Sequence, residues 1–235
     1  MKAHDPTDAA AAFAELGRIK LGETDLDGVL SRVADLARRT LPGATQVSIT
    51  LLRERGAVTA AHTGQTALRL DEAQYERGAG PCLEAASTGT VVEVPDTATD
   101  DRWNRWGADA AEAGMGSVLS LSLPIGDKVG GALNVYGGAP GAFDAAAMRQ
   151  ARTFVRYAAV ALANAHLYDT TAGLARHMQA AMESRAVIEQ AKGIIMGERR
   201  CTADEAFTIL TRVSQDTNRK LRDVAAALVE RTQRG

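Results

Sequence analysis

Side chains suited to binding a charged partner gather in the last quarter of the chain. From Arg199 to Arg222 six basic residues stand against three acidic ones, although the whole chain carries a formal net charge of −2. Arginine and lysine bind phosphate, and an asparagine such as Asn218 can hydrogen-bond to base edges. Because the positive excess is small, charge alone leaves RNA, DNA and an acidic protein open as partners. The candidate contact residues are Arg185, Gln190, Lys192, Gly193, Arg212, Asn218, Arg219, Lys220 and Arg222.

Some of these candidates also have a purely structural interpretation. A glycine inside a helix costs about 1 kcal/mol relative to alanine, so the position of Gly193 predicts a close approach to another backbone or to a ligand. Arg185 and Lys192 can instead form ion pairs with Glu183 and Glu189 and stabilise their own helix. The group as a whole therefore predicts a binding surface more strongly than any one of its members.

A second group of candidates consists of Cys82, Trp103 and Trp106, which we consider for a ligand pocket. Cys82 follows Pro81 at an expected helix start, where the helix dipole can lower a thiol pKa and favour a redox or adduct role. A small buried side chain is the alternative, and we favour it. The two tryptophans lie three positions apart on an expected helix. They either wall a pocket or anchor that helix to a sheet, and anchoring is the commoner use.

Other residue combinations argue against catalysis and metal binding. His4 and His62 have no partner at the spacing of metal ligands. The loop Gly78–Gly80 lacks the lysine and the length of a phosphate-binding P-loop. Neighbouring acids, such as Asp71-Glu72, are interpreted as helix caps and solvated faces rather than acid–base pairs. The sequence therefore predicts no enzyme, no metal site and no certain cofactor.

The elements that must position these residues begin with an α+β region. Apolar residues at helical spacing predict helices, and alternating apolar and polar residues predict strands. Helices are expected over 7–20, 26–41, 81–86, 103–113 and 143–168, with a loop and a short helix reaching Gly80. Strands are expected over 47–51, 57–62, 91–94, 117–124 and 128–136, with turns at Arg55-Gly56 and Gly126-Asp127. This order is typical of an antiparallel sheet flanked by helices.

The helix that begins near Phe143 has no clear stop signal, since proline is absent from Gly141 to the end. Apolar or small residues recur on it at alternating intervals of three and four or their sums, which is a heptad seam. The seam consists of Tyr157, Val160, Leu167, Leu174, Met178, Ala181 and Ile188. We predict a long connecting helix that pairs with a second copy of itself, with Asn164 as a register-setting residue. The alternative is two helices separated at Thr171–Gly173.

The last segment divides into three short helices. The first ends near Met196-Gly197, and Thr202 begins the second, with Glu205 three positions later as a capping box. The third opens near Leu221. The second helix is expected to bury Ala206, Ile209, Leu210 and Val213, and the third Val224, Ala225, Leu228 and Val229.

Three sequence blocks in this segment carry a family resemblance. Ala191-Lys192-Gly193, Glu205-Ala206-Phe207 and Leu221-Arg222-Asp223-Val224-Ala225 occur in this order. Through them the region from Ser184 onward resembles the ANTAR domain of bacterial antitermination regulators. The resemblance implies a three-helix bundle that binds paired stem-loops in leader RNA and prevents an intrinsic terminator from forming. These blocks, and not the charge, favour RNA over the other partners.

The preceding region resembles a GAF sensor domain over roughly Leu26 to Leu167. The resemblance is carried by Gly78–Ala85, Val94-Pro95-Asp96, Asp101–Trp103 and Gly131–Tyr136. It implies an antiparallel sheet with helices on both sides and, in many members, a pocket for a small ligand of varying identity. The motifs for bilin attachment and for cyclic-nucleotide binding are not found. A GAF-type methionine sulfoxide reductase would need more than one cysteine here, and this region has only Cys82.

Together these features predict an α+β protein with an N-terminal helix over 1–25, a GAF sensor over 26–165, a connecting coiled-coil helix over 166–183 and an all-α ANTAR bundle over 184–235. Two distant cysteines, no apolar run long enough for a bilayer and no apolar signal core predict a cytoplasmic protein without membrane contact. The heptad seam predicts a homodimer through the connecting helix. The expected partner is leader RNA with tandem stem-loops. The alternatives are a GAF-linked DNA-binding transcription factor and a protein-interaction module.

Overall fold

The structure is a computed structural model that describes residues 14–125 and 130–234. The chain forms two compact units, which meet in sequence between Asp169 and Thr170 and are described separately. Half of the helix expected over 7–20 lies outside the described residues, and the described half is helical only to Gly17. The expected turn at Gly126-Asp127 also lies outside the described residues. No helix in the described part of the chain is both long and apolar enough to cross a bilayer.

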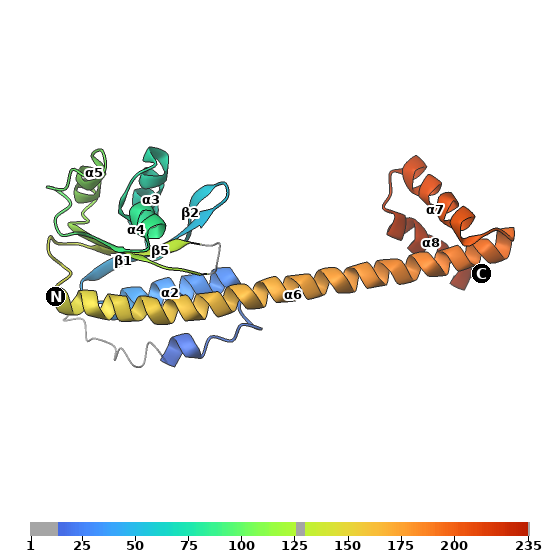
Figure 1. Cartoon of the computed structure of the whole chain (residues 1–235), viewed down its shortest axis with the longest axis horizontal. Coiled ribbons are helices and arrows are strands. Elements are labelled where there is room, and N and C mark those ends of the chain that lie inside the picture. Colours follow the sequence, from blue (N-terminus) through green and yellow to red (C-terminus); the bar gives the residue numbers. More distant parts are fainter. Residues whose placement is uncertain (1–13, 126–129, 235) are drawn as a thin grey trace. The chain divides into compact units, whose positions relative to one another are not determined.

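The first unit is built on a five-stranded sheet in the order β2-β1-β5-β4-β3, with every neighbouring pair antiparallel. The expected strand pairs and the antiparallel sheet are confirmed. The central strand β5 is buried along its whole length because helices cover both faces of the sheet (Figure 1). The strands are β1 (Ala44–Arg53), β2 (Gly56–His62), β3 (Val91–Val94), β4 (Ser117–Ser122) and β5 (Gly131–Gly137).

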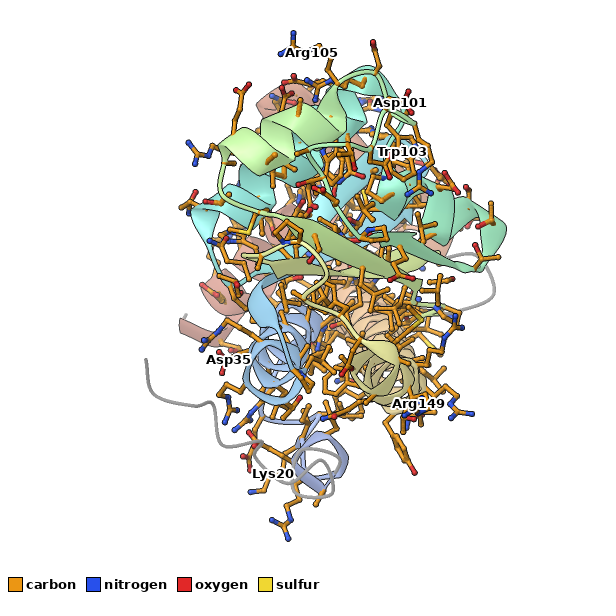
Figure 2. All side chains as sticks on the ribbon, turned by 90° about the vertical axis from the view of Figure 1, so that its left-hand side faces the viewer. Lys20, Asp35, Asp101, Trp103, Arg105 and Arg149 are labelled. Atoms are coloured by element: carbon orange, nitrogen blue, oxygen red, sulfur yellow. The ribbon has the colours of Figure 1, made fainter. Side chains whose placement is uncertain are left out.

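One face of the sheet packs on α2 (Leu26–Thr40) and on the first part of α6 (Ala145–Arg199). Figure 2 views this layer end-on, with Asp35 of α2 and Arg149 of α6 on the opposite side of the sheet from Trp103. Asp25 caps α2 by accepting a hydrogen bond from the Gly28 amide. Alternating strand residues supply the apolar contacts on this face, as their period of two requires. The largest fully buried side chains here are Leu30, Leu36, Leu41, Ile49, Leu119, Leu121, Leu123, Leu133, Phe154 and Leu162.

The opposite face is covered by α3 (Gln65–Arg77), α4 (Pro81–Thr88) and α5 (Trp106–Glu112). Pro81 stands in the first turn of α4, as expected. The expectation of a loop and a short helix before Gly80 is wrong. The chain forms there the 13-residue helix α3, which ends at Arg77. Its buried face combines Ala67 and Leu70 with the polar Asp71 and Gln74. Because two of the four buried positions are polar, the sequence does not show the apolar spacing that is typical of a helix.

The expectation that both tryptophans lie on one helix is also wrong. The helix α5 begins at Trp106, whereas Trp103 lies in the turn before it. Asn104 and Arg105 between them have positive φ angles of 45° and 66°. This left-handed backbone breaks the helical path, so the two rings approach from different directions.

The helix α6 runs for 55 residues and passes through Gly173 without interruption. The alternative of two helices separated at Thr171–Gly173 is therefore not observed. Asp144 accepts a hydrogen bond from the Ala147 amide at 2.7 Å and caps the helix start. Phe154 and Leu162 on its first part are buried in the first unit, and its last part belongs to the second unit.

The second unit combines the end of α6 with α7 (Ala203–Thr217) and α8 (Leu221–Arg234). The capping box of Thr202 and Glu205 is present in full. The small core consists of Ala191, Ile195, Ala206, Leu210, Val224 and Ala225. Most of the expected core positions are confirmed, but Val213 is 41% exposed. It lines a groove that the short helices leave open.

Candidate functional site

A row of polar side chains crosses the sheet beneath α3 and α4. In the register of the sheet, Asn134 on β5 is paired with Ser48 on β1 and with Ser120 on β4. The Asn134 amide donates to the hydroxyl of Ser48 at 3.1 Å and to that of Thr50 at 2.9 Å. All four residues are fully buried, which is unusual for a sheet face and indicates a specific use.

Asp71 reaches this row from α3 and is completely buried. Its carboxylate accepts hydrogen bonds from the hydroxyls of Tyr136 at 2.5 Å and Thr59 at 2.9 Å. Burial raises the pKa of Asp71 to about 6, and the hydrogen bonds from Tyr136, Ser48 and Thr59 oppose that rise. The interpretation of Asp71-Glu72 as caps or a solvated face is therefore wrong for Asp71.

Two buried oxygen atoms in the row lack a hydrogen-bond partner in the described part of the chain. They are the Ser120 hydroxyl and the Asn134 side-chain carbonyl, which lie on paired positions of neighbouring strands. An unsatisfied buried acceptor costs about 1–3 kcal/mol. A hydrogen-bond donor brought to this part of the row would satisfy both atoms.

Cys82 contacts the same cluster from the start of α4. Its backbone N–H donates to the side-chain oxygen of Gln74 at 2.9 Å. The residue is fully buried, and burial together with the nearby Asp71 carboxylate raises the pKa of its thiol. Because a protonated buried thiol is a poor nucleophile, the favoured reading of Cys82 as a small buried side chain agrees with the geometry.

The two tryptophans make the contacts of anchors. The Trp106 indole is fully buried and donates to the backbone oxygen of Leu70 at 2.9 Å, which joins α5 to α3. The Trp103 indole donates to the Glu84 carboxylate at 3.1 Å. Their rings meet edge to face with centroids 6.2 Å apart, and the Arg102 guanidinium stacks 4.2 Å from the Trp103 centroid. A pocket-lining role for either ring stays a prediction.

The candidate RNA-contacting residues belong to the second unit and come from α6, α7 and the α7–α8 junction. The side chains of this group are exposed, with one exception. Lys192 is only 16% exposed and pairs with Glu189 at 3.0 Å, which is the structural alternative considered for it. Asn218 ends α7 in the left-handed conformation and so turns the basic run Arg219–Arg222 away from the helix axis.

Gly193 is exposed, and a Cβ atom added to it would meet nothing within 4 Å. A close approach by another part of the described chain therefore does not explain this glycine. The other explanation, an approach by an external partner, stays a prediction. Arg185, Lys192 and Arg199 follow one another at intervals of seven residues on α6 and so lie in one row, within about 20° per step.

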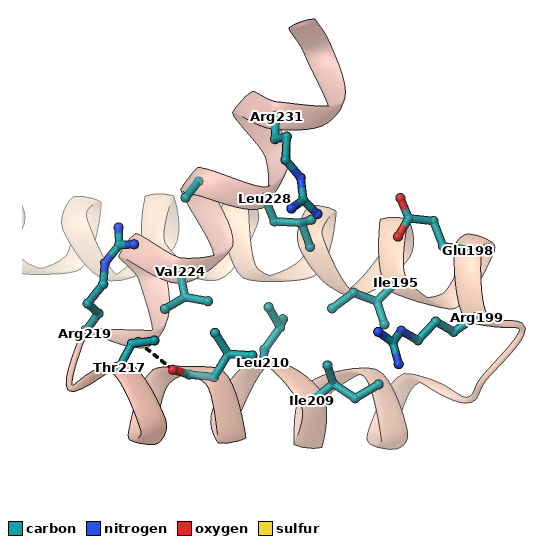
Figure 3. Close-up of a pocket in the computed structure, with 12 residues that line it drawn as sticks. Ile195, Glu198, Arg199, Ile209, Leu210, Thr217, Arg219, Val224, Leu228 and Arg231 are labelled. Atoms are coloured by element: carbon teal, nitrogen blue, oxygen red, sulfur yellow. Dashed lines mark hydrogen bonds between the residues drawn. The ribbon is translucent and has the colours of Figure 1, made fainter. Parts of the chain in front are cut away.

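A groove of about 400 Å³ opens between the end of α6, α7 and α8 (Figure 3). Its apolar lining includes Ile195, Ile209, Leu210, Val213 and Leu228, and its charged lining consists of Glu198, Arg199, Arg219 and Arg231. Of these arginines, sequence analysis named only Arg219 as a contact residue. The heptad spacing of Arg199 from Lys192 was a signal that could have found a second one. No sequence pattern identifies Arg231 as a groove residue, because its position at the groove depends on how α8 packs on the other helices.

Comparisons with known proteins are consistent with this division. Residues 23–163 match the GAF domain family and residues 176–229 match the ANTAR domain family. No curated protein matches the chain. The reduced form of fRMsr of Staphylococcus aureus is 19% identical, with a TM-score of 0.54, and the match covers 69% of this chain and 99% of that one.

Two further solved structures resemble the first unit. A phycocyanobilin-bound GAF domain from a cyanobacterial phytochrome is 14% identical, with a TM-score of 0.51 and coverage of 68% of this chain and 96% of that one. Free methionine-R-sulfoxide reductase from Neisseria meningitidis, in complex with its substrate, is 16% identical, with a TM-score of 0.51 and coverage of 70% and 89%. At these identities the likeness shows a shared fold and nothing about activity.

Proposed function

The chain belongs to the GAF domain family and carries an ANTAR domain, and from this premise we propose that it is a transcription antitermination regulator. The ANTAR domain binds paired stem-loops in leader RNA and prevents a terminator from forming, while the GAF domain senses a signal. The observation that carries this proposal is the coincidence of the ANTAR match with an exposed basic three-helix bundle.

The buried polar row supports a small-molecule signal. Ser120 and Asn134 offer two unsatisfied oxygen atoms inside the first unit, and a ligand with hydrogen-bond donors would satisfy them. The only cysteine of this unit, Cys82, is buried and its thiol pKa is raised. A reductase activity like that named for the structural neighbours is therefore not part of the proposal.

An exposed apolar stripe on α6 supports a homodimer. Tyr157, Val160, Leu167, Leu174 and Met178 are each between 53% and 66% exposed, and they recur at heptad spacing. A second copy would present the same stripe and cover it, as in a parallel coiled coil. Two ANTAR bundles would then be available for two stem-loops, which is how the dimer serves the proposed mechanism.

Sedimentation tests the dimer. Leu174→Glu places a charge on the stripe, and we expect it to raise the dimer dissociation constant about tenfold or more, since burying a leucine contributes about 1.5–3 kcal/mol. Ala180→Glu, at an exposed position on the outer side of the heptad, serves as the control and should leave the constant unchanged. A wild-type protein that sediments as a monomer both free and with RNA contradicts the dimer.

A gel-shift comparison tests RNA recognition itself. Wild-type protein is titrated against a pool of RNAs with two tandem hairpins of randomised loop sequence and against duplex DNA of matched length. We expect tighter binding to RNA by a factor of about ten or more, and the bound fraction yields the preferred hairpin. Equal binding to both, or preference for DNA, favours the alternative of a DNA-binding transcription factor. Binding to neither favours a protein-interaction module.

A further inference from the structure

The groove of the second unit combines an apolar floor with a charged rim. Its floor is aliphatic, and Val213 within it is 41% exposed, although it belongs to a helix with an apolar face. Three arginines surround that floor: Arg199 at the end of α6, Arg219 in the loop between α7 and α8, and Arg231 on α8. Figure 3 shows the Arg199 and Arg219 side chains at opposite ends of the groove and Arg231 above Leu228.

The charges at the groove favour an anion. Within the described residues, none of the three arginines forms an ion pair, and Glu198 is the only acid among the lining residues. Arg219 makes one weak contact, from its guanidinium to the backbone oxygen of Asp223 at 3.4 Å. Three exposed guanidinium groups around an apolar floor therefore suit a molecule with an apolar body and negative charges at its sides.

We propose that this groove receives one unpaired base from the loop of an RNA hairpin, while Arg199, Arg219 and Arg231 bind the phosphates beside that base. The inference rests on the proposed function. It adds to that function a binding site for one base and two contact residues, Arg199 and Arg231. A nucleotide has a flat apolar base and an anionic phosphate, which matches the groove. Loop bases are already unstacked, so the protein does not have to open a helix to bind one.

The size and the chemistry of the groove are adequate for a base. Its volume of about 400 Å³ falls within the roughly 300–1,000 Å³ of small-molecule sites. The lining contains no aromatic ring, so the base lies against the aliphatic floor, which excludes water, while the guanidinium groups bind the phosphates. A helix of a second copy is the competing occupant, but it would need a longer row of apolar anchors and gives no role to three cations.

The test fills the groove without changing its charge. Ala227 is exposed and lines the groove from α8, and Ala227→Leu keeps a good helix former while occupying the space of the base. Ala180→Leu, on an exposed part of α6 in the same unit and outside the groove, is the matched control. Dissociation constants are measured with the full chain and the hairpin RNA selected above. They are measured again with versions of that RNA in which one loop nucleotide at a time lacks its base.

We expect Ala227→Leu to weaken binding to the intact hairpin about tenfold, because the larger side chain excludes the base from the aliphatic floor that buries it. Removal of one particular loop base should weaken wild-type binding by a similar factor. With that RNA, wild-type and Ala227→Leu proteins should bind equally, since the lost contact is the same one. Ala180→Leu should bind every RNA as the wild type does, and circular dichroism should show equal helical content in all three proteins.

A second pair of variants tests the phosphates. Arg199→Gln and Arg231→Gln should each lower the slope of log affinity against log salt concentration by about 0.7. Arg176→Gln, an exposed position on α6 outside the groove, should leave the slope unchanged.

The possible outcomes separate the two levels of the proposal. If wild-type protein binds no hairpin RNA, the proposed function fails and the groove assignment fails with it. If hairpin binding is intact and Ala227→Leu binds as tightly as the wild type, only the groove assignment is overturned. It is also overturned if Ala227→Leu changes the sedimentation of the free protein while RNA affinity stays the same, because the groove is then an interface between copies.

Discussion

Replacement of Trp106 by alanine is expected to lower the unfolding free energy of the first unit by about 3–5 kcal/mol. The indole is completely buried, and its N–H bond to the Leu70 backbone oxygen at 2.9 Å joins α5 to α3. The variant leaves a large cavity and removes the hydrogen bond that joins α5 to α3. Urea unfolding followed by the fluorescence of Trp103, the only other tryptophan of the chain, measures the loss.

The conservative replacement Trp106→Phe is the control for this prediction. It keeps most of the apolar contact and removes the hydrogen bond, so the loss should be clearly smaller than for alanine. If Trp106→Ala is as stable as the wild type to within about 1 kcal/mol, the residue is no anchor. That result would favour the other interpretation, in which the Trp106 ring lines an open pocket.

The stability of the first unit should fall as pH rises from about 4 to above 6, and Asp71→Asn should abolish that part of the dependence. Burial raises the pKa of Asp71 from 3.8 to about 6 in the folded protein. Below pH 3.8 the carboxyl is protonated in both folded and unfolded chains. Between the two values only the unfolded chain releases the proton, so rising pH favours unfolding.

The size of this effect is about 3 kcal/mol, because one pKa unit corresponds to about 1.4 kcal/mol. The measurement is the difference in unfolding free energy between wild type and Asp71→Asn at several pH values. The difference should fall with pH and become constant above the folded pKa. Burial also raises the pKa values of Tyr75, Tyr136 and Cys82, so these neighbours stay neutral throughout this window. A difference that does not change with pH contradicts the assignment.

Local chemistry in the sequence predicted much of the fold. Pro81, the capping box of Thr202 and Glu205, and the alternation of Val47, Ile49 and Leu51 each act over a few residues, and the structure confirms them. The uninterrupted α6 follows from the same kind of signal, since no proline breaks it.

The parts that failed depend on contacts between distant segments. Asp71 looks like a solvated acid until Tyr136 and Thr59, on two strands of the sheet, supply its donors. Val213 fits an apolar helix face, but it is 41% exposed and lines the groove instead of the core. The sequence predicted the candidate RNA surface as a set of residues. It could not predict the groove, because the groove forms only when α6, α7 and α8 pack together.

The strand order of the first unit also sets the sequence of events during synthesis. β1 pairs at once with the adjacent β2, but its other edge pairs with β5, and Ser48 and Asn134 are 86 residues apart. That edge stays open until almost the whole unit has left the ribosome, and an open strand edge invites pairing with other chains. The second unit is made of helices from neighbouring segments and needs no such wait. A nascent chain is therefore most vulnerable to aggregation just before β5 emerges.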